Sequence, residues 1–299
     1  MEATIDYREW PPSAPLAGAI LAYWRVAGDG RSVPSPTILP DAYVEIVINL
    51  GGAVTLAGAP FRGSQPPRAV VGLLDTAIEM QYPADVCTFG IRLHPARAAT
   101  VLGVAASAIV NIVSPLDRVC KVLDDRLAPV VDAHPRMESA DARDALERVL
   151  LDHLRGATPK DDLIVRAVDR LLGAEVPVTV TDLATEFGLS HRHLHRRFLD
   201  EVGVSPKRLE RLARFARAWR EAVMGPPLTW ADLALANGYA DQSHLVREFR
   251  AFGARPPTHL FTAEWYDATN VTRGEDASRH VQSVQDRVDG TRHDGRRRK

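Results

Sequence analysis

Two short stretches of the chain carry side chains that can form hydrogen bonds with the edges of nucleic-acid bases, at spacings that suit one face of a helix. Arginine can bind O6 and N7 of guanine, glutamine can pair with adenine, serine can reach either base, and valine can contact a thymine methyl group. Arg197, Arg250 and Lys207 are better suited by type to bind phosphates. The predicted base-facing residues are His191, Arg192, His195 and Arg196 in the first stretch and Gln242, Ser243, Val246 and Arg247 in the second.

Positive charge is concentrated around the first of these stretches. The whole chain is almost neutral, with 37 Lys+Arg against 38 Asp+Glu. Residues 190–220 nevertheless hold nine basic and three acidic side chains. A local basic patch on a neutral chain is typical of a surface that binds a polyanion. A solvated helix face has a similar composition, so the charge alone does not choose between the two interpretations.

Both stretches belong to an internal repeat in the C-terminal part of the chain. The first copy covers residues 181–198 and the second covers residues 230–249. One residue is inserted in the turn of the second copy, which changes the offset between the copies from 50 to 51. The aligned residues are Leu183-Ala184 with Leu233-Ala234, Gly188 with Gly238, Leu194 with Leu245, and Phe198 with Phe249.

Each copy has the residues that a helix-turn-helix needs. The small alanines allow two helices to cross closely, and a glycine follows where the first helix must end and the chain must turn. Ser190 and Asp241 are suited to cap the second helix of each copy. The leucine and the phenylalanine four residues later pin that helix to a core, so the side chains between them point outward. The N-terminal part of a recognition helix normally reads the bases.

A third helix is predicted to join the two copies. Ser205 caps it, Pro206 starts it, and apolar residues follow on one face, namely Leu209, Leu212, Phe215, Ala216 and Trp219. A helix of about 17 residues spans ~25 Å. It could hold two recognition helices about one DNA turn apart, ~34 Å, so that one chain binds two successive major grooves.

These motifs resemble the DNA-binding domain of the AraC/XylS family of bacterial transcriptional regulators over residues 160–264. The most diagnostic stretches are Gly203-Val-Ser-Pro206 and Gly238-Tyr-Ala-Asp-Gln-Ser-His-Leu245. The resemblance implies two helix-turn-helix subdomains in a sequence-specific regulator. Three alternating histidines in the first recognition helix, His191, His193 and His195, depart from common family members. Carried over by position, it gives as base-facing Arg192, His195, Arg196, Gln242, Ser243, Val246 and Arg247.

The N-terminal part has the pattern of a β-rich domain with helices after it. Short runs rich in β-branched and aromatic residues alternate with turn residues. Strands are expected at 42–50, 53–57, 69–71, 77–82 and 86–93, and helices at 95–104, from Ser114-Pro115 onward, and at 139–154. Residues 40–49 and 89–95 are similar to a subgroup of the same family, which implies a β-rich module that senses a ligand or dimerises.

The predicted fold class is therefore α+β, with a barrel-like N-terminal domain and an all-α C-terminal domain. A chain of 299 residues is long enough for two domains. The tail is rich in Arg, Asp, Gly and Ser and has no Leu, Ile or Phe, which predicts disorder. The predicted boundaries are 1–135 for a sensor or dimerisation domain, 136–159 for a helical linker, 160–265 for the DNA-binding domain and 266–299 for the tail.

Two sets of N-terminal residues allow two interpretations each. The aromatic side chains of Trp10, Tyr23, Trp24, Tyr43 and Phe61 could line a ligand pocket or belong to the core, and the core is favoured for most of them. The apolar stripe of helix 139–154 could pack on its own domain or form a dimer seam.

Catalytic and metal-binding patterns are missing from the sequence. The first 93 residues contain no histidine, so His94 stands alone after the β-rich segment and metal catalysis there is not expected. His191 and His195 share a helix face, but two imidazoles without a carboxylate or thiol make a poor metal site. Cys87 and Cys120 are too few for a disulfide framework or a structural zinc site. We expect no enzyme activity, no metal and no cofactor.

The expected partners follow from these motifs. They are promoter DNA in double-stranded form, a small-molecule effector at the N-terminal domain, RNA polymerase, and a second copy of the chain in a homodimer. No apolar run approaches the ~20 residues of a membrane span, so the chain is expected to stay in the cytoplasm. The alternatives are an enzyme or ligand-binding module with a regulatory DNA-binding tail, and an adaptor whose repeats no longer bind DNA.

Overall fold

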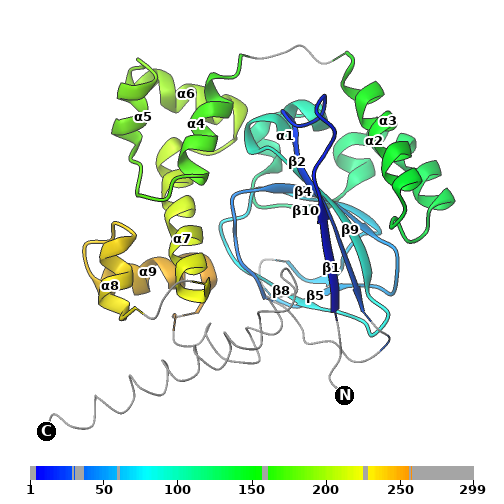
Figure 1. Cartoon of the computed structure of the whole chain (residues 1–299), viewed down its shortest axis with the longest axis horizontal. Helices are drawn as coiled ribbons and strands as arrows, with labels where there is room; N and C mark the ends of the chain where they lie inside the picture. Colours follow the sequence, from blue (N-terminus) through cyan, green and yellow to red (C-terminus); the bar gives the residue numbers. More distant parts are fainter. Residues whose placement is uncertain are drawn as a thin grey trace, which may run out of the picture.

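The computed structural model describes residues 5–28, 30, 37–58, 61–156, 161–224, 228–255 and 257. Two antiparallel sheets form the N-terminal domain, helices follow it, and the C-terminal part is entirely helical within the described residues (Figure 1). The predicted α+β class is confirmed. The last residues of the predicted linker, 157–159, and the predicted disordered tail 266–299 lie outside the described residues.

The larger sheet has six strands, in the spatial order β1-β2-β9-β4-β7-β10. Its strands are β1 (Ile5–Trp10), β2 (Ile20–Gly28), β4 (Val44–Asn49), β7 (Arg68–Val71), β9 (Cys87–Leu93) and β10 (Val113–Pro115). The smaller sheet has the order β3-β8-β5-β6, with β3 (Thr37–Ile38), β5 (Thr55–Leu56), β6 (Gly63–Ser64) and β8 (Ile78–Gln81).

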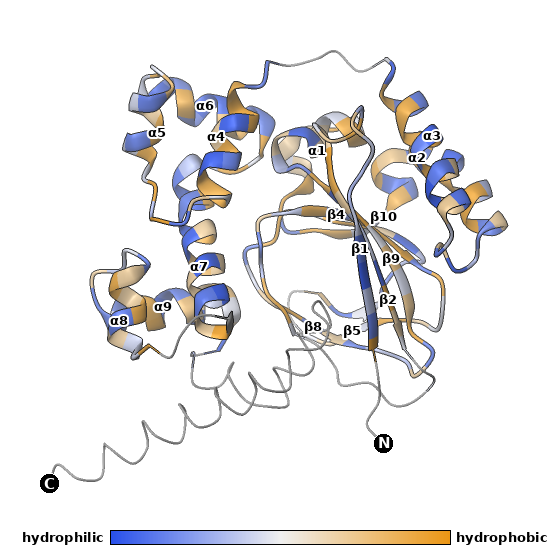
Figure 2. Cartoon of the chain, in the orientation of Figure 1, coloured by the Kyte–Doolittle hydropathy of each residue, from blue (hydrophilic) through white to orange (hydrophobic). Residues whose placement is uncertain are grey.

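One face of the larger sheet forms the main core. Tyr23 pairs with Ile91, Ile91 with Ile46, and Ile46 with Val70, so these side chains share a face. All four are at most 1% exposed. Tyr23 also stacks on Phe89, with ring centroids 6.1 Å apart, which places this aromatic residue in the core. Figure 2 shows the alternation of hydrophobic and hydrophilic residues along the helices that cover this domain.

Four helical segments follow the sheets, and two of the sequence-based boundaries were wrong. They are α1 (Pro95–Leu102), the 3₁₀ turn η1 (Ala106–Ile109), α2 (Leu116–Ala133) and α3 (Ala140–Leu154). The first helix ends before Gly103, which has φ +67°. The predicted second helix begins at Leu116 with Pro115 as its N-cap, because Ser114 and Pro115 pair with β7 as the edge strand β10.

The apolar stripe of α3 packs on its own domain. Ala142, Leu146 and Leu150 are fully buried within a single chain. They belong to the same core as Leu123 and Leu127 of α2. This stripe is therefore not available as a dimer seam.

Six helices form the C-terminal part that the structure describes. They are α4 (Leu163–Leu172), α5 (Val180–Glu186), α6 (His191–Glu201), α7 (Pro206–Met224), α8 (Trp230–Ala236) and α9 (Gln242–Gly253). Figure 1 places α7 between the pair α5–α6 and the pair α8–α9. Within the described residues, no helix has the length and apolar character that crossing a membrane requires.

Candidate nucleic-acid interface

Each repeat copy folds as two helices joined by a sharp turn, as the sequence predicts. Gly188 and Gly238 have φ of +62° and +71°, the left-handed conformation that glycine adopts without strain. The next helix is capped in both copies. The Ser190 hydroxyl accepts a hydrogen bond from the His193 N–H at 3.2 Å, and the Asp241 carboxylate accepts one from the His244 N–H at 2.7 Å.

The predicted base-facing residues lie on the open side of α6 and α9, except Val246, which packs against the core. Their opposite faces are held by Leu194 and Phe198 in α6 and by Leu245 and Phe249 in α9, which are all fully buried. Val246 is half-buried. The exposed members of the set are His191, Arg192, His195, Arg196, Gln242, Ser243 and Arg247. Of the residues expected to bind phosphates, Arg250 and Lys207 are exposed and Arg197 is half-buried.

Arg197 and Lys207 are both engaged by carboxylates of the chain. Arg197 donates to Glu201 at 2.5 Å and to Asp161 at 2.8 Å, and these hydrogen bonds raise the pKa of its guanidinium. Lys207 donates to Glu210 at 2.7 Å. A phosphate would have to displace these partners.

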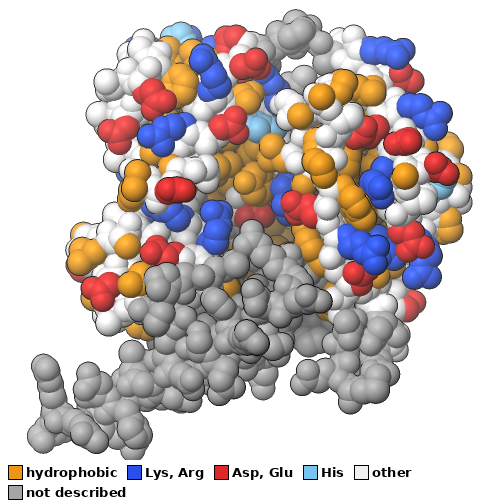
Figure 3. Space-filling model, viewed as in Figure 1, with side chains coloured by type: hydrophobic (Ala, Val, Ile, Leu, Met, Phe, Trp, Pro, Cys, Tyr) orange, Lys and Arg blue, Asp and Glu red, His pale blue; other side chains and the backbone are white. Residues whose placement is uncertain are grey.

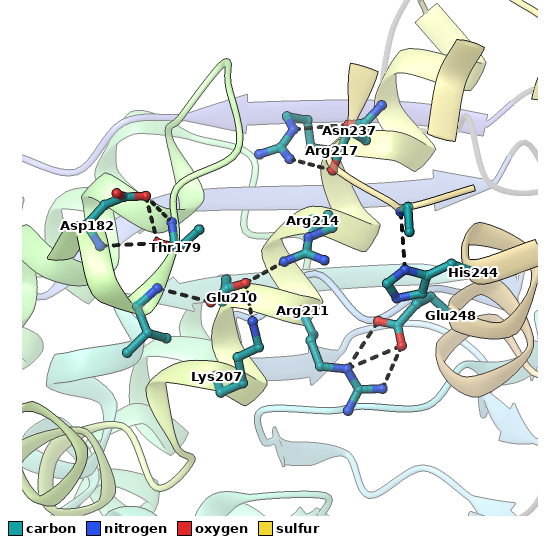
Figure 4. Close-up of polar contacts among 12 residues, drawn as sticks. Thr179, Asp182, Lys207, Glu210, Arg211, Arg214, Arg217, Asn237, His244 and Glu248 are labelled. Carbon is teal, nitrogen blue, oxygen red and sulfur yellow. Dashed lines mark hydrogen bonds and ion pairs between the residues drawn. The ribbon is translucent and has the colours of Figure 1, made fainter. Parts of the chain in front are cut away.

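Helix α7 is tied to the first helix-turn-helix unit through a buried carboxylate. Glu210 is 2% exposed and accepts hydrogen bonds from the Val180 N–H at 3.1 Å and from Lys207 (Figure 4). It is also paired with Arg214. Val180 is the first residue of α5, so the carboxylate lies at a helix N-terminus, where negative charge is favourable.

The same helix is tied to the second unit through two arginines. Arg211 binds Glu248 of α9 with both arms of its guanidinium, the shortest distance being 2.7 Å (Figure 4). Arg217 donates to the side-chain and backbone oxygens of Asn237 at 3.0 and 3.3 Å. Burial lowers the pKa of Arg217. Glu248 and Asn237 are buried, so α7 holds both units through polar groups shielded from water.

These contacts change the interpretation of the basic patch. Within the described residues, five of its nine cations are paired with carboxylates, namely Arg197, Lys207, Arg208, Arg211 and Arg214. Sequence reasoning missed these pairs because most of the partners come from other elements. Local signals existed for Glu201, four residues after Arg197, and for Glu210, three residues after Lys207 and four before Arg214. Glu248 was a third signal, as a carboxylate beside Phe249 on the apolar side of a predicted amphipathic helix.

The N-terminal domain has a polar cluster on the sheet face that bears Trp24. Arg92 pairs with Glu45 at 2.9 Å and with Glu9 at 3.5 Å. Burial raises the pKa of Glu45, and Arg92 opposes that shift. The Tyr7 hydroxyl donates to Glu9 at 2.6 Å.

Gln65 is a second polar feature of this domain. It is 4% exposed, and its Oε1 has no hydrogen-bond partner among the residues that the structure describes. Its N–H donates to the carbonyl of Val54, which continues the β5–β6 pairing by one residue. Gln65 therefore shares a face with Val54, a member of the apolar cluster that packs against Trp24 and Tyr7.

The histidines do not form a metal site with other ligands. His191 and His195 are exposed on α6, and no group of three or more His, Cys, Asp or Glu side chains in the described ranges is placed to hold a metal ion. Cys87 and Cys120 are free thiols and half-buried.

Comparison with known proteins divides the chain into two matched regions. Residues 183–263 match the family model of a helix-turn-helix domain, and residues 8–115 match a domain of unknown function, DUF6597. No curated protein matches the chain.

Among solved structures, the chain is similar to ToxT from Vibrio cholerae strain SCE256 with bound unsaturated fatty acid, at 11% identity and a TM-score of 0.41 over 91% of this chain and 97% of that one. ToxT from Vibrio cholerae O395 gives 10% identity and a TM-score of 0.40 over 86% and 96%. The AraC-like transcriptional activator CuxR gives 12% identity and a TM-score of 0.30 over 74% and 95%.

Proposed function

We propose that this chain, whose C-terminal part is an AraC-type helix-turn-helix domain, is a sequence-specific DNA-binding regulator of transcription. The match over residues 183–263 and the two helix-turn-helix units support a DNA-binding regulator. One observation supports base reading above all. The two recognition helices α6 and α9 bury their apolar faces and turn Arg192, Arg196, Gln242 and Arg247 to solvent while the N-terminal domain is docked.

The proposed roles divide the DNA-facing residues into two groups. Arginine and glutamine near the start of each recognition helix suit base edges. Arg250 lies in the last turn of α9 and suits phosphates, and Arg197 is proposed to bind a phosphate by releasing Asp161 and Glu201. The proposed base readers are His191, Arg192, His195, Arg196, Gln242, Ser243, Val246 and Arg247.

Selection of binding sites from a random duplex pool tests this function. The full chain would be used at two salt concentrations, beside a double variant Arg192→Ala with Arg247→Ala. Lys121→Ala is the matched control, because Lys121 is an exposed cation on α2. We expect the wild type and the control to enrich two motifs about 10 base pairs apart, and the double variant to lose them.

Two results would contradict the proposal. Salt-sensitive binding without any motif would point to a non-specific DNA-binding role. Absence of binding at both salt concentrations would mean that the repeat has a structural role only.

We further propose that the N-terminal domain, residues 1–135, senses a small molecule and is joined by a linker, residues 136–159, to the DNA-binding domain, residues 160–265. Two features support a polar ligand inside this domain: the polar cluster around Arg92, and the buried Gln65 Oε1, which lacks a partner within the described ranges. Buried polar groups are normally hydrogen-bonded. Thermal unfolding of the full chain with a small-molecule panel tests it. A compound that raises Tm of the wild type and not of Gln65→Leu would support the site, whereas equal shifts in both proteins would contradict it.

The remaining proposed partners are a second copy of the chain and RNA polymerase, at a promoter in the cytoplasm. Val122 of α2 is 57% exposed and offers apolar surface for a homodimer. Sedimentation of the full chain measures this directly, and a monomer at all concentrations would contradict it.

A further inference from the structure

One part of the N-terminal domain reaches both recognition helices. It consists of residues 72–79 and 106–113, here called the docking platform. The two segments are bound together: the Leu73 N–H donates to the Ile109 carbonyl at 2.9 Å, and the Asp75 N–H donates to the Asn111 side chain at 3.0 Å. The docking platform is therefore one structural unit. It is continuous with strands of both sheets, β7, β8 and β10.

The first contact of the docking platform is with the C-terminal end of α6. Gly203 follows this helix with φ +84°, and a Cβ at Gly203 would collide with the carbonyl oxygen of Ala106. Because the obstacle is backbone, it could not move aside as a flexible side chain would. The end of the first recognition helix therefore rests directly on the 3₁₀ turn η1.

The second contact is with the C-terminal end of α9. The Ala77 N–H donates to the Phe252 carbonyl at 2.8 Å, so backbone is bound to backbone. Two residues later, Glu79 of β8 pairs with Arg255 at 2.8 Å. A third contact is with α7, where Asp75 of the docking platform is paired with Arg208 in the first turn of that helix.

The helix α1 adds contacts to the first unit alone. His94 is hydrogen-bonded to Asp169 of α4 at 3.1 Å, and Arg97 is paired with Asp162. Figure 3 shows a hollow between the N-terminal domain and the C-terminal helices, where hydrophobic side chains gather beside charged ones. The two halves of the molecule thus meet through these polar and backbone contacts and through one apolar core that contains residues of both.

We propose that the docking platform sets the relative position of the two recognition helices, so that the N-terminal domain specifies in part which half-site spacing the protein accepts. This inference rests on the proposed DNA-binding function. Helix α7 joins the two units directly, and the docking platform closes a second path between the ends of α6 and α9. Two helix-turn-helix units that are connected both by α7 and by the docking platform bend less relative to each other than two units connected by α7 alone.

A charge-swap experiment on the full chain tests the proposal. Glu79→Arg places a second cation beside Arg255. The double variant Glu79→Arg with Arg255→Glu restores an ion pair in which the two charges have exchanged positions. The matched control is Glu186→Arg, which reverses a similarly exposed ion pair with Arg170 inside the first unit. Each protein is titrated with duplexes whose half-sites are at the selected spacing or are one base pair closer or farther apart.

We expect Glu79→Arg to reduce the discrimination between spacings about three- to fivefold, the range of one partly exposed ion pair. The swapped double variant should recover the wild-type ratio within about twofold, and Glu186→Arg should keep it. Hydrogen exchange of residues 248–255, measured without DNA, should rise in Glu79→Arg and return in the double variant.

The outcomes separate this inference from the proposed function. If the wild type and Glu79→Arg discriminate equally between half-site spacings and show equal hydrogen exchange, the proposed role of the docking platform is overturned, while the proposed DNA-binding function still stands. A double variant that stays as defective as Glu79→Arg would also overturn it, because the pair itself would then not matter. A wild type that binds no duplex would overturn both.

Discussion

At the scale of single residues, Arg247 offers the sharpest test of base reading. It is exposed on α9, one turn after Ser243, while the neighbouring Glu248 is buried. If it binds a guanine, Arg247→Ala should weaken binding to the preferred site by ~1–3 kcal/mol and relax specificity at one base pair. Binding curves on the selected duplex and on its single-base variants measure this.

Arg250 is the matched control for Arg247. It lies in the last turn of the same helix, where a cation suits a phosphate. Arg250→Ala should weaken all duplexes alike. If Arg247→Ala behaves in the same way, the assignment of Arg247 to a base is wrong.

His94 is the residue with a predictable pH dependence. Its Nδ1 accepts the Ala96 N–H at 3.2 Å, so its proton lies on Nε2 and is donated to Asp169. Burial lowers the pKa of His94 from the ordinary 6.5, while Asp169 acts in the opposite direction. Above this ordinary pKa the ring is neutral in both folded and unfolded chains. Below it, the unfolded chain binds a proton that the folded chain does not, so acid should lower the free energy of unfolding.

The change that isolates this effect is His94→Gln. We expect the wild type to lose more stability than the variant between about pH 7 and pH 5, by less than about 1.4 kcal/mol per pH unit. Denaturant unfolding at several pH values measures the two slopes. Parallel slopes would mean that His94 does not contribute.

Residue exposure could be predicted from the sequence, whereas residue pairing could be predicted only within a helix, as for Arg197 and Glu201. Leu194 and Phe198 are four residues apart, and that spacing alone fixes which side of α6 faces the core. Arg197 was assigned to phosphates from its type. Its partner Asp161 is 36 positions away in the sequence, and no local pattern indicates such a contact.

At the scale of the elements, α7 depends on one buried carboxylate. Glu210 accepts from Val180 and Lys207 and is paired with Arg214. Glu210→Ala leaves these donors without a partner and should cost ~2–3 kcal/mol of unfolding free energy. Glu210→Gln keeps one acceptor and should lose less. Urea unfolding distinguishes the two, with Glu186→Ala as an exposed control expected to cost at most ~1 kcal/mol. An equal loss in Glu210→Ala and the control would contradict the role of this network.

The end of α6 gives a second prediction at this scale, based on two glycines with the same left-handed backbone. Gly188 has φ +62° and open space within 4 Å of the position that a Cβ would take, whereas a Cβ at Gly203 would collide with Ala106. Gly188→Ala should cost about 1 kcal/mol from backbone strain alone. Gly203→Ala should cost ~1–3 kcal/mol more, because the domains must also separate. Denaturant unfolding measures both variants. Equal losses of unfolding free energy would mean that η1 moves away from an added Cβ at no measurable cost.

Helix boundaries were predictable where the signal is local and not where it depends on the sheet. Ser190 and Asp241 cap their helices as expected, because a cap involves residues three positions apart. Ser114-Pro115 has the same appearance in the sequence but forms the edge strand β10. The partner strand β7 lies more than forty positions earlier, and only the assembled sheet supplies its hydrogen bonds.

At the scale of the whole molecule, the salt dependence of DNA binding measures how many cations are available to phosphates. Five of the nine basic residues in 190–220 are paired with carboxylates, whereas Arg192, Arg196, Arg220, Arg247 and Arg250 are exposed. If each of these five exposed cations releases one counterion from the DNA, the slope of log affinity against log salt is about −4 to −5, whereas the five paired cations in addition would give about −9. Titrations between about 50 and 200 mM salt cover the useful range. A slope near −9 would mean that the ion pairs of α6 and α7 open on DNA, and Asp161→Asn should then raise affinity by freeing Arg197. A slope near −4 that Asp161→Asn leaves unchanged would mean that these cations serve the protein's own architecture.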